Sequence, residues 1–279
     1  MRICLVITIL GAFILADAES SASITPVPSS SQTQPPAQAS TKLTRQPILE
    51  VATIKPVKEF NAYNTRDLKQ GRHLFVYQAS VKHLMMLAYD VDLSQVVNGP
   101  GWSGNDLFDV QAQAIAGVDP RDEDNAEELL KELLNDRFKL KFHKEQRMLP
   151  VYVLSIAKGG SKLKASDPGS SSNNSGCAHF GECSFSKDSL SRFASWLSSV
   201  VLDTKVIDKT GLIGDYDFDL KWIPDESQFA RFGAAVPMEG SKGPNLFTAI
   251  QEQLGLKLKQ TKALLDVLVI DHVEKPTEN

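Results

Sequence analysis

The chain has 279 residues, with 30 lysines and arginines against 34 aspartates and glutamates, so its formal net charge at pH 7 is -4. The basic residues are scattered among acidic ones instead of forming one stripe, which argues against nucleic acid as a partner. A near-neutral chain of this length, with 42% hydrophobic residues, has enough apolar material for one large folded domain or two small ones.

The first 18 residues have the features of a secretory signal peptide. Met1 and Arg2 supply positive charge, an apolar run ends at Ala16, and Ala18 completes the small-x-small pattern that signal peptidase accepts. We expect cleavage after Ala18 and a secreted or periplasmic protein with no transmembrane segment. The alternative is an uncleaved anchor, but the run is shorter than the roughly 20 apolar residues that span a bilayer.

Residues 19–47 are rich in Ser, Thr, Pro, Gln and Ala and contain few large apolar residues. Such a segment buries too little surface to offset the entropy of ordering its backbone. The composition predicts a disordered tether that holds the folded part away from a membrane or wall. A merely frayed terminus has the same composition, and this alternative stays open.

A first module is expected over residues 48–160, and it opens with a strand at 73–77. Ser80 is a good N-cap for the helix that follows. The apolar residues of that helix recur at i, i+3, i+4 and i+7: they are Val81, Leu84, Met85 and Ala88. A short strand is expected at 95–97, and the two glycines around Pro100 indicate a turn.

The second half of this module is expected to begin with an extended segment at 107–113. The acidic stretch 119–128 then leads into a helix, because negative charge suits a helix N-terminus. The buried stripe of that helix is Leu129, Leu130, Leu133 and Leu134. Residues 138–142 alternate as a strand and 151–156 form the apolar run of another. The predicted order is β-α-β-β-α-β-β.

A linker is expected over residues 161–178, and the two cysteines left after signal cleavage, Cys177 and Cys183, lie at its end. An even pair in an oxidising compartment indicates a disulfide, worth about 2 kcal/mol for so small a loop. His179 and Glu182 lie in the same loop, which leaves a small metal site open. However, the C-x2-C spacing of a structural zinc site is absent.

A second module is expected over residues 179–279, with the same element order. Asp188 or Ser189 caps a helix, a strand follows at 205–207, and Tyr216 to Trp222 alternates as another strand. Asn245 starts the last helix. Two further strands, 254–258 and 265–270, are expected to pair with each other. Residues 224–244 form an insertion without a counterpart in the first module, and long loops of this kind are often functional or disordered.

The two modules repeat one pattern of buried residues and turns. An offset of 116 residues lays Leu130–Ile156 on Leu246–His272 without a gap. At an offset of 109 the helix of residues 81–88 falls on that of residues 190–197, and at 110 Phe108 and Asp109 fall on Phe218 and Asp219. We therefore predict an internal duplication and an α+β fold of two tandem modules, each a small sheet packed by two helices.

The acidic triplet Asp215, Asp217 and Asp219, with Glu226, has the ligand spacing of a calcium loop. Leu220 stands where such a loop needs glycine. Strict alternation with aromatic residues favours the other interpretation, a half-buried strand with an acidic face in water.

No other pattern indicates catalysis or a cofactor. The five histidines (His73, His83, His143, His179 and His272) form no ligand pair of the H-E-x-x-H kind, and no G-x-S-x-G elbow is present. Asp271 and His272 are neighbours in a strand and point to opposite faces, so they are not expected to pair. We assign no catalytic, cofactor-binding or metal-binding residue.

Several longer motifs occur together in the folded part of the chain. They are Leu134–Leu140, Pro150–Leu154, Ala157–Gly160, Val206–Leu212, Tyr216–Phe218, Leu246–Leu256 and Val269–Pro276. As a set they resemble the exported domain-of-unknown-function family expanded in soil bacteria of the acidobacterial kind, over residues 48–279. The resemblance implies secretion and this architecture, and it transfers no active site. In some relatives a similar domain follows a membrane metallopeptidase of the beta-lactam-sensor type, which this chain lacks.

Ala79–Leu84 and Ala126–Leu134 also resemble the helices of the short N-terminal domain of secretins and TonB-dependent receptors, a module that binds protein partners. The leading hypothesis is therefore a non-catalytic exported protein that binds another protein or a cell-envelope component. The alternative is an extracellular hydrolase or small-molecule sensor with its site between the modules, for which the 224–244 insertion is one candidate cover.

Overall fold

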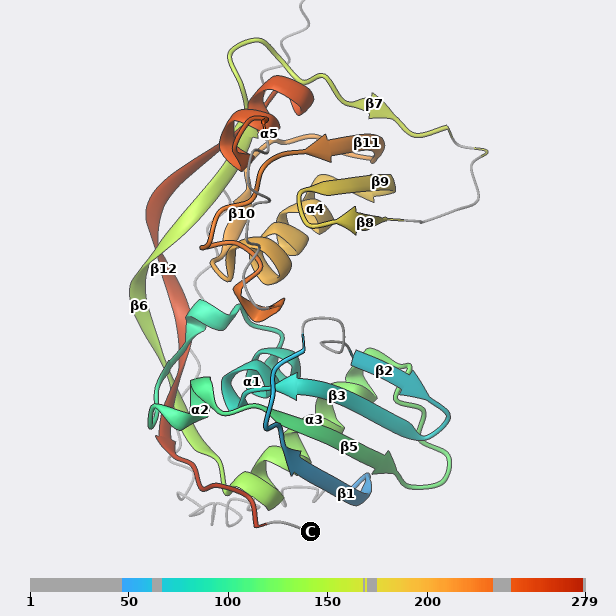
Figure 1. Ribbon diagram of the computed structural model, residues 1–279, viewed down its shortest axis with the longest axis vertical. Helices are drawn as coiled ribbons and strands as arrows, with labels where there is room; N and C mark the ends of the chain where they lie inside the picture. Colours follow the sequence, from blue (N-terminus) through green and yellow to red (C-terminus); the bar gives the residue numbers. More distant parts are fainter. Residues whose placement is uncertain (1–46, 62–66, 168, 170–174, 233–241, 278–279) are drawn as a thin grey trace, which may run out of the picture. The chain divides into compact units, whose positions relative to one another are not determined.

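The first sheet is antiparallel, in the order β1-β5-β3-β2. Its strands are β1 (Leu49–Pro56), β5 (Phe108–Ala114), β3 (His73–Ala79) and β2 (Asp67–Gln70). Two helices, α1 (Val81–Tyr89) and α3 (Glu123–Phe138), pack against it (Figure 1). The apolar faces of the sheet and of the helices form the first hydrophobic core. This computed structural model describes residues 47–61, 67–167, 169, 175–232 and 242–277.

A second antiparallel sheet has the order β7-β11-β9-β8. Its strands are β7 (Lys164–Ala165), β11 (Asp215–Lys221), β9 (Glu182–Ser189) and β8 (Gly176–His179). Helices α4 (Leu190–Trp196) and α5 (Leu246–Leu254) supply the apolar side chains of the second core, and α4 continues into the wider turns of η3 (Leu197–Leu202). Ring contacts among Phe185, Phe193 and Phe218 contribute to this core. The mixed α+β class predicted from the sequence is confirmed.

A third sheet has the order β10-β6-β12-β4 and joins the two cores. Two long strands, β6 (Lys141–Ile156) and β12 (Leu256–His272), run antiparallel along their whole length (Figure 1). The short strand β4 (Val96–Asn98) is parallel to the C-terminal part of β12, and β10 (Val206–Asp208) is parallel to the C-terminal part of β6. The remaining short elements are η2 (Leu93–Gln95), α2 (Trp102–Asn105) and η4 (Ala230–Phe232).

The prediction of two separate strands at the end of each module was wrong. Residues 138–142 alternate in polarity, but Phe138 is the last residue of α3 and is fully buried, and Lys139 ends the helix with a left-handed backbone. A single strand then runs from Lys141 to Ile156. Likewise Leu254 belongs to α5, and one strand replaces the predicted 254–258 and 265–270 pair. The polar residues between the apolar ends do not interrupt the strands, because each backbone remains paired with the other strand.

Each core is completed by a strand from the other half of the chain. Leu268 and Ile270 of β12 pack in the first core, whereas Leu154 of β6 packs in the second. The described residues all belong to one contact unit, and the two cores do not divide at a single point of the sequence. The extents of the predicted modules, 48–160 and 179–279, stay a prediction.

Corresponding strand pairs in the two halves have the same register. In one half Val96 pairs with Leu268, and in the other half Val206 pairs with Tyr152. Val206 lies 110 residues after Val96, and Tyr152 lies 116 residues before Leu268. These are the offsets read from the sequence, and they support the predicted duplication.

A turn before the first helix of each half is also repeated. Gln78 and Lys187 both have a positive φ, 53° and 51°, although neither is glycine. Their backbone N–H groups donate to the carboxylates of Asp109 and Asp217 at 3.0 and 2.8 Å. The structural counterpart of Asp109 is therefore Asp217, not Asp219, and the offset predicted for this strand was too large by two residues.

The predicted helix starts are confirmed. The side chains of Ser80, Ser189 and Asn245 each accept a hydrogen bond from the backbone N–H three residues later. Each cap satisfies one of the N–H groups that have no partner inside the helix. The expected signal peptide and the tether up to residue 46 lie outside the described residues, as do parts of the predicted linker and of the 224–244 insertion.

Candidate functional site

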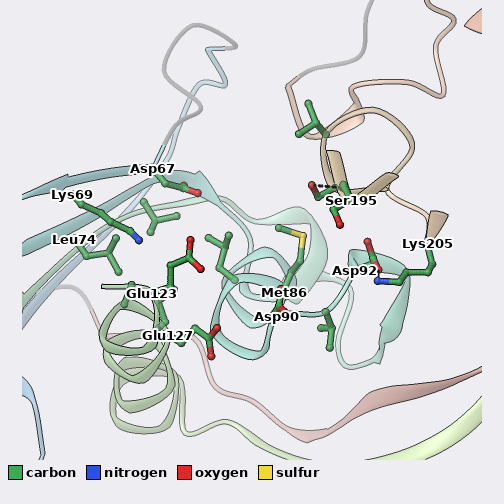
Figure 2. A pocket seen from close by; sticks show the side chains of 17 residues that line it. Asp67, Lys69, Leu74, Met86, Asp90, Asp92, Glu123, Glu127, Ser195 and Lys205 are labelled. Carbon is green, nitrogen blue, oxygen red and sulfur yellow. Dashed lines mark hydrogen bonds and ion pairs between the residues drawn. The ribbon is translucent and has the colours of Figure 1, made fainter. Parts of the chain in front are cut away.

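A cavity of about 550 Å³ lies between elements of the first core and the α4–η3 segment of the second. One wall comes from β2, β3 and the facing ends of α1 and α3. The other wall comes from α4, η3 and Lys205 (Figure 2). Its lining includes Asp67, Lys69, Leu74, Val76, Met86, Leu87, Asp90, Val91, Asp92, Glu123, Ala126, Glu127, Leu130, Ser195, Ser199, Val200 and Lys205. The volume is in the range of small-molecule sites in proteins. We call it the acidic cleft.

The floor of the acidic cleft is apolar. Leu74, Val76 and Leu130 are almost completely buried and belong to the first core. Met86, on α1, is 6% exposed and reaches the same floor. Strand alternation in β3 and helical periodicity in α1 and α3 place these residues on the inner faces of their elements. A bound molecule would therefore contact hydrocarbon on this side.

The rim of the acidic cleft is predominantly negative. Five carboxylates and two lysines line it. Asp90 ends α1 with a left-handed backbone, and Glu123 and Glu127 lie on the first turns of α3. Glu127 forms an ion pair with Lys131 at 2.9 Å. Asp90 and Glu123 are both exposed to solvent at the rim (Figure 2).

One ion pair crosses the acidic cleft. The Lys205 ammonium lies 2.9 Å from Asp92 Oδ2, with the Asp92 side chain only 7% exposed and that of Lys205 39% exposed. Gln95 fixes the loop that carries Asp92: its amide oxygen accepts from the Asp92 N–H, and its amide nitrogen donates to the Asp266 carbonyl of β12. The carboxylate is thus held firmly while its partner comes from the other side.

On the α4–η3 side of the cleft, no nucleophilic side chain lies beside a general base. Ser199 donates from its hydroxyl to the Ser195 carbonyl oxygen at 3.0 Å, one turn earlier. Neither histidine nor cysteine is among the residues that line the cleft. The groups present can bind and orient a charged ligand, but this lining provides no activated nucleophile.

The predicted disulfide between Cys177 and Cys183 is present and joins β8 to β9. It lies away from the acidic cleft, whose lining includes neither residue. Glu182 of the same hairpin pairs with Lys221 at 2.6 Å, and this hydrogen-bonded ammonium lowers the pKa of the Glu182 carboxyl. Within the described residues no group of three or more His, Cys, Asp or Glu is arranged to hold a metal ion.

The acidic triplet lies on β11, as the strand interpretation predicted. Asp217 accepts hydrogen bonds from the Lys187 backbone N–H and from the Ser166 hydroxyl, and these bonds lower the pKa of its carboxyl. Asp219 accepts from the Ser184 hydroxyl at 2.6 Å. Two of the three carboxylates therefore stabilise turns and neighbouring strands within the sheet.

The prediction that Asp271 and His272 do not pair is confirmed. His272 contacts Glu274 at 2.8 Å, and Asp271 pairs across the ladder with His143 Nδ1 at 2.9 Å. The hydrogen bond to Asp271 raises the pKa of His143. The four side chains of these two ion pairs are each about half exposed, and none lines the acidic cleft.

Sequence reasoning missed the acidic cleft itself. The acidic stretch that leads into α3 has a sufficient local explanation in the helix dipole, and Asp90 and Asp92 belong to no sequence motif. The alternative hypothesis placed a site between the modules, with the 224–244 insertion as one candidate cover. In its described part, Phe229 is buried in the second core and Gln228 accepts a hydrogen bond from the Trp222 indole at 2.7 Å. These anchoring residues do not line the cleft.

One family profile, described as Protein of unknown function (DUF3738), matches residues 82–273. No curated protein matches the chain. No solved structure matches it either. Among the described residues, no helix is both long and apolar enough to cross a membrane.

Proposed function

Because the chain belongs to the DUF3738 family, whose function is unknown, its role must be argued from its own site, and we propose that it is a non-catalytic binding protein. The acidic cleft takes a small organic cation with an apolar part. The observation that carries this proposal is one cavity of about 550 Å³ with a hydrocarbon floor and a rim of five carboxylates against two lysines.

The charge balance of the rim favours a cation over an anion. Lys205 is engaged by Asp92 and Glu127 is engaged by Lys131. Asp90 and Glu123 remain at the solvent-exposed mouth, on two helices that converge there. A cleft lined mainly by one sign of charge concentrates ligands of the opposite sign. An amine or quaternary ammonium group would lie between these carboxylates, with its apolar part on Met86 and Val200.

Binding without turnover is favoured by what the lining contains. A hydrolase needs a nucleophile with a base in hydrogen-bond reach, or a metal that activates water. The two serines of the lining lie on one helical face, and Ser199 is bonded to a main-chain carbonyl. The alternative of a hydrolase in the same cleft has no such observation behind it, whereas the sensor alternative shares this site.

Isothermal titration with matched probes tests the proposal. Hexyltrimethylammonium and hexylamine carry the expected charge and hexanoate carries the opposite one. We expect the two cations to bind and hexanoate not to bind. In the double variant Asp90→Asn/Glu123→Gln the affinity for the cations should fall about tenfold or more, as expected when two charged partners are removed. The matched control, Asp124→Asn/Glu252→Gln, removes two exposed carboxylates outside the lining and should bind as the unaltered protein does.

Three results would overturn the proposal. The first is that no probe binds, and the second is that hexanoate binds as well as the cations. The third is that both double variants lose affinity for the cations equally. Turnover of an ester or amide panel by the purified protein, lost in Ser195→Ala, would replace binding with catalysis.

A second candidate keeps the leading hypothesis of a protein partner. The favouring observation is β1, an eight-residue strand at the edge of its sheet. Among the residues that the structure describes, β1 pairs with β5 alone, and Val51 is 49% exposed. An open edge can accept a strand from another chain. Recovery of one partner from envelope extract by the unaltered protein, and its loss with Thr53→Pro, would support this candidate. Recovery that the substitution leaves unchanged would exclude the β1 edge.

Export is part of the proposal. It is supported by the leader pattern in residues 1–18 and by the Cys177–Cys183 disulfide, since disulfides persist mainly in oxidising compartments. N-terminal sequencing of the protein from a bacterial periplasmic or culture fraction should begin at Glu19. A protein that stays in the cytoplasm with both thiols free would contradict export.

A further inference from the structure

The face of the β10-β6-β12-β4 sheet that points away from the second core carries unpaired positive charge. Leu256 and Leu258 of β12 are buried in that core. Because side chains alternate along a strand, Lys257 and Lys259 lie on the opposite face, and both are exposed. No ion pair involves either lysine among the residues that the structure describes. We call this surface the basic face.

The neighbours of these lysines on the sheet add a cation and aliphatic surface and no carboxylate. Ser155 and Val153 of β6 lie opposite Lys257 and Lys259 in the ladder. Ile207 of β10 lies beside Val153, and Lys209 follows with its N–H bonded to the Leu154 carbonyl. The basic face is therefore a sheet surface with lysines around half-buried aliphatic side chains.

The corresponding surface in the other half of the molecule contains carboxylates that pair with its cations. An offset of 116 residues places His143 at the position of Lys259 and Asp271 at that of Ser155. There His143 and Asp271 pair at 2.9 Å, and Glu145 contacts Arg147. The position of Lys259 thus carries a paired charge in one half and an unpaired lysine in the other, whereas the counterpart of Lys257 is also a lysine, Lys141. The two ends of the sheet therefore differ in their carboxylates: Asp271 and Glu145 have no acidic counterpart beside Lys257 and Lys259.

We propose that the basic face docks the protein on an anionic lipid bilayer. Lysines attract anionic headgroups as point charges and need no fixed fork geometry, and each contributes about fivefold to binding near the surface. The lysines spread over the surface of a sheet instead of converging in a pocket, which suits an array of headgroups better than a single phosphate. The half-buried aliphatic side chains of Val153 and Ile207, on the same face, suit the headgroup boundary.

This docking surface is independent of the acidic cleft. Lys257, Lys259 and Lys209 are not among the residues that line the cleft. A contact between these lysines and a bilayer would therefore not involve the residues that line the cleft. A failure of cation binding in the cleft would leave this inference untouched.

Vesicle flotation tests the inference. The protein lacking only residues 1–18, so that their apolar run cannot itself insert, is mixed at low salt with vesicles of phosphatidylglycerol and phosphatidylcholine (30:70) or of phosphatidylcholine alone. We expect binding to the anionic vesicles only, and its loss on adding salt. Lys257→Glu/Lys259→Glu should weaken binding by on the order of tenfold or more. Lys141→Glu/Lys144→Glu, on β6 in the other half of the molecule, is the matched control and should stay within about twofold.

Binding to neutral vesicles, equal weakening in both variants, or no binding to anionic vesicles would overturn the inference. A polyphosphate arm separates a soluble polyanion from the bilayer. Tight binding of polyphosphate through Lys257 and Lys259, without vesicle binding, would show a polymer site and also overturn it. Circular dichroism of each variant excludes loss of folding as the cause.

Discussion

Met148 and Leu264 lie directly opposite each other in the β6–β12 ladder, and both side chains are more than half exposed, at 58% and 56%. They are also the same position of the sequence repeat, 116 residues apart. Exchanging the two strands about this pair reproduces the ladder: Val151 pairs with Thr261, and Glu145 pairs with Val267. The β6–β12 pair therefore has a local two-fold axis of symmetry near Met148 and Leu264. Each strand passes from one core to the other across this axis.

The equivalence of the two helix ends gives a stability prediction. Lys139 and Gly255 occupy the same left-handed cap position, with φ of 50° and 67°. A Cβ on Gly255 would lie 2.1 Å from the Gly160 carbonyl oxygen, whereas Lys139 already carries one. We expect Gly255→Ala to lower the free energy of unfolding by more than the 1–2 kcal/mol or so of a left-handed backbone alone. Urea unfolding measures this, with Lys139→Ala as control; equal effects would contradict the clash.

Removal of the disulfide should have a modest cost. Cys177 and Cys183 are six positions apart, so the crosslink restricts only a short loop of the unfolded chain. Cys177→Ser/Cys183→Ser is expected to lose about 2 kcal/mol of unfolding free energy. Thermal unfolding with and without reductant measures it. The double variant should be insensitive to reductant, and a reductant effect that persists would mean that the bond is not the cause.

The His143–Asp271 pair should make the stability of the folded protein fall as the pH rises. The hydrogen bond to Asp271 raises the pKa of His143 in the folded state. The stability from this pair is therefore fully present below the unfolded pKa of His143 and is lost as the pH rises through the folded value. An NMR titration should show a higher pKa for His143 than for its counterpart in Asp271→Asn. Identical titration curves in the two proteins would show that the hydrogen bond to Asp271 does not raise the pKa of His143.

The Asp92–Lys205 pair should couple the two walls of the acidic cleft. With its side chain 7% exposed, Asp92 would be left without a counter-charge in Lys205→Met. We expect a loss of about 1–3 kcal/mol in unfolding free energy. Asp92→Asn/Lys205→Met should recover part of it, because the buried charge is then gone. A double-mutant cycle measures the coupling, and additive effects would show that the pair does not link the walls.

Local patterns in the sequence were sufficient to predict much of this fold. Caps such as Ser80 and Asn245, the helical stripes, the acidic strand and the disulfide all depend on residues close in sequence. The continuous strands were missed because Phe138-Lys-Leu-Lys-Phe142 alternates like a strand although its first residue ends a helix. The passage of β6 and β12 between the cores depends on the pairing of residues that are about a hundred or more positions apart in the chain. Hydrophobic periodicity describes only neighbouring residues and cannot predict such pairs.

The acidic cleft could not be predicted for the same reason. Asp90, Glu123 and Lys205 are far apart in the chain, and each has an ordinary local explanation as a helix end or a strand flank. Only the packing of α1, α3 and α4 brings them to one cavity. The excess of carboxylates there has no counterpart in the nearly balanced composition of the whole chain.

The most direct test of the central claim is chemical-shift mapping by NMR with hexyltrimethylammonium. The account predicts saturable shifts concentrated at the floor and rim of the acidic cleft, at Met86, Asp90, Glu123 and Val200, and their disappearance in Asp90→Asn/Glu123→Gln. Shifts confined to another surface, or none at millimolar probe, would contradict the assignment of the cleft as the binding site.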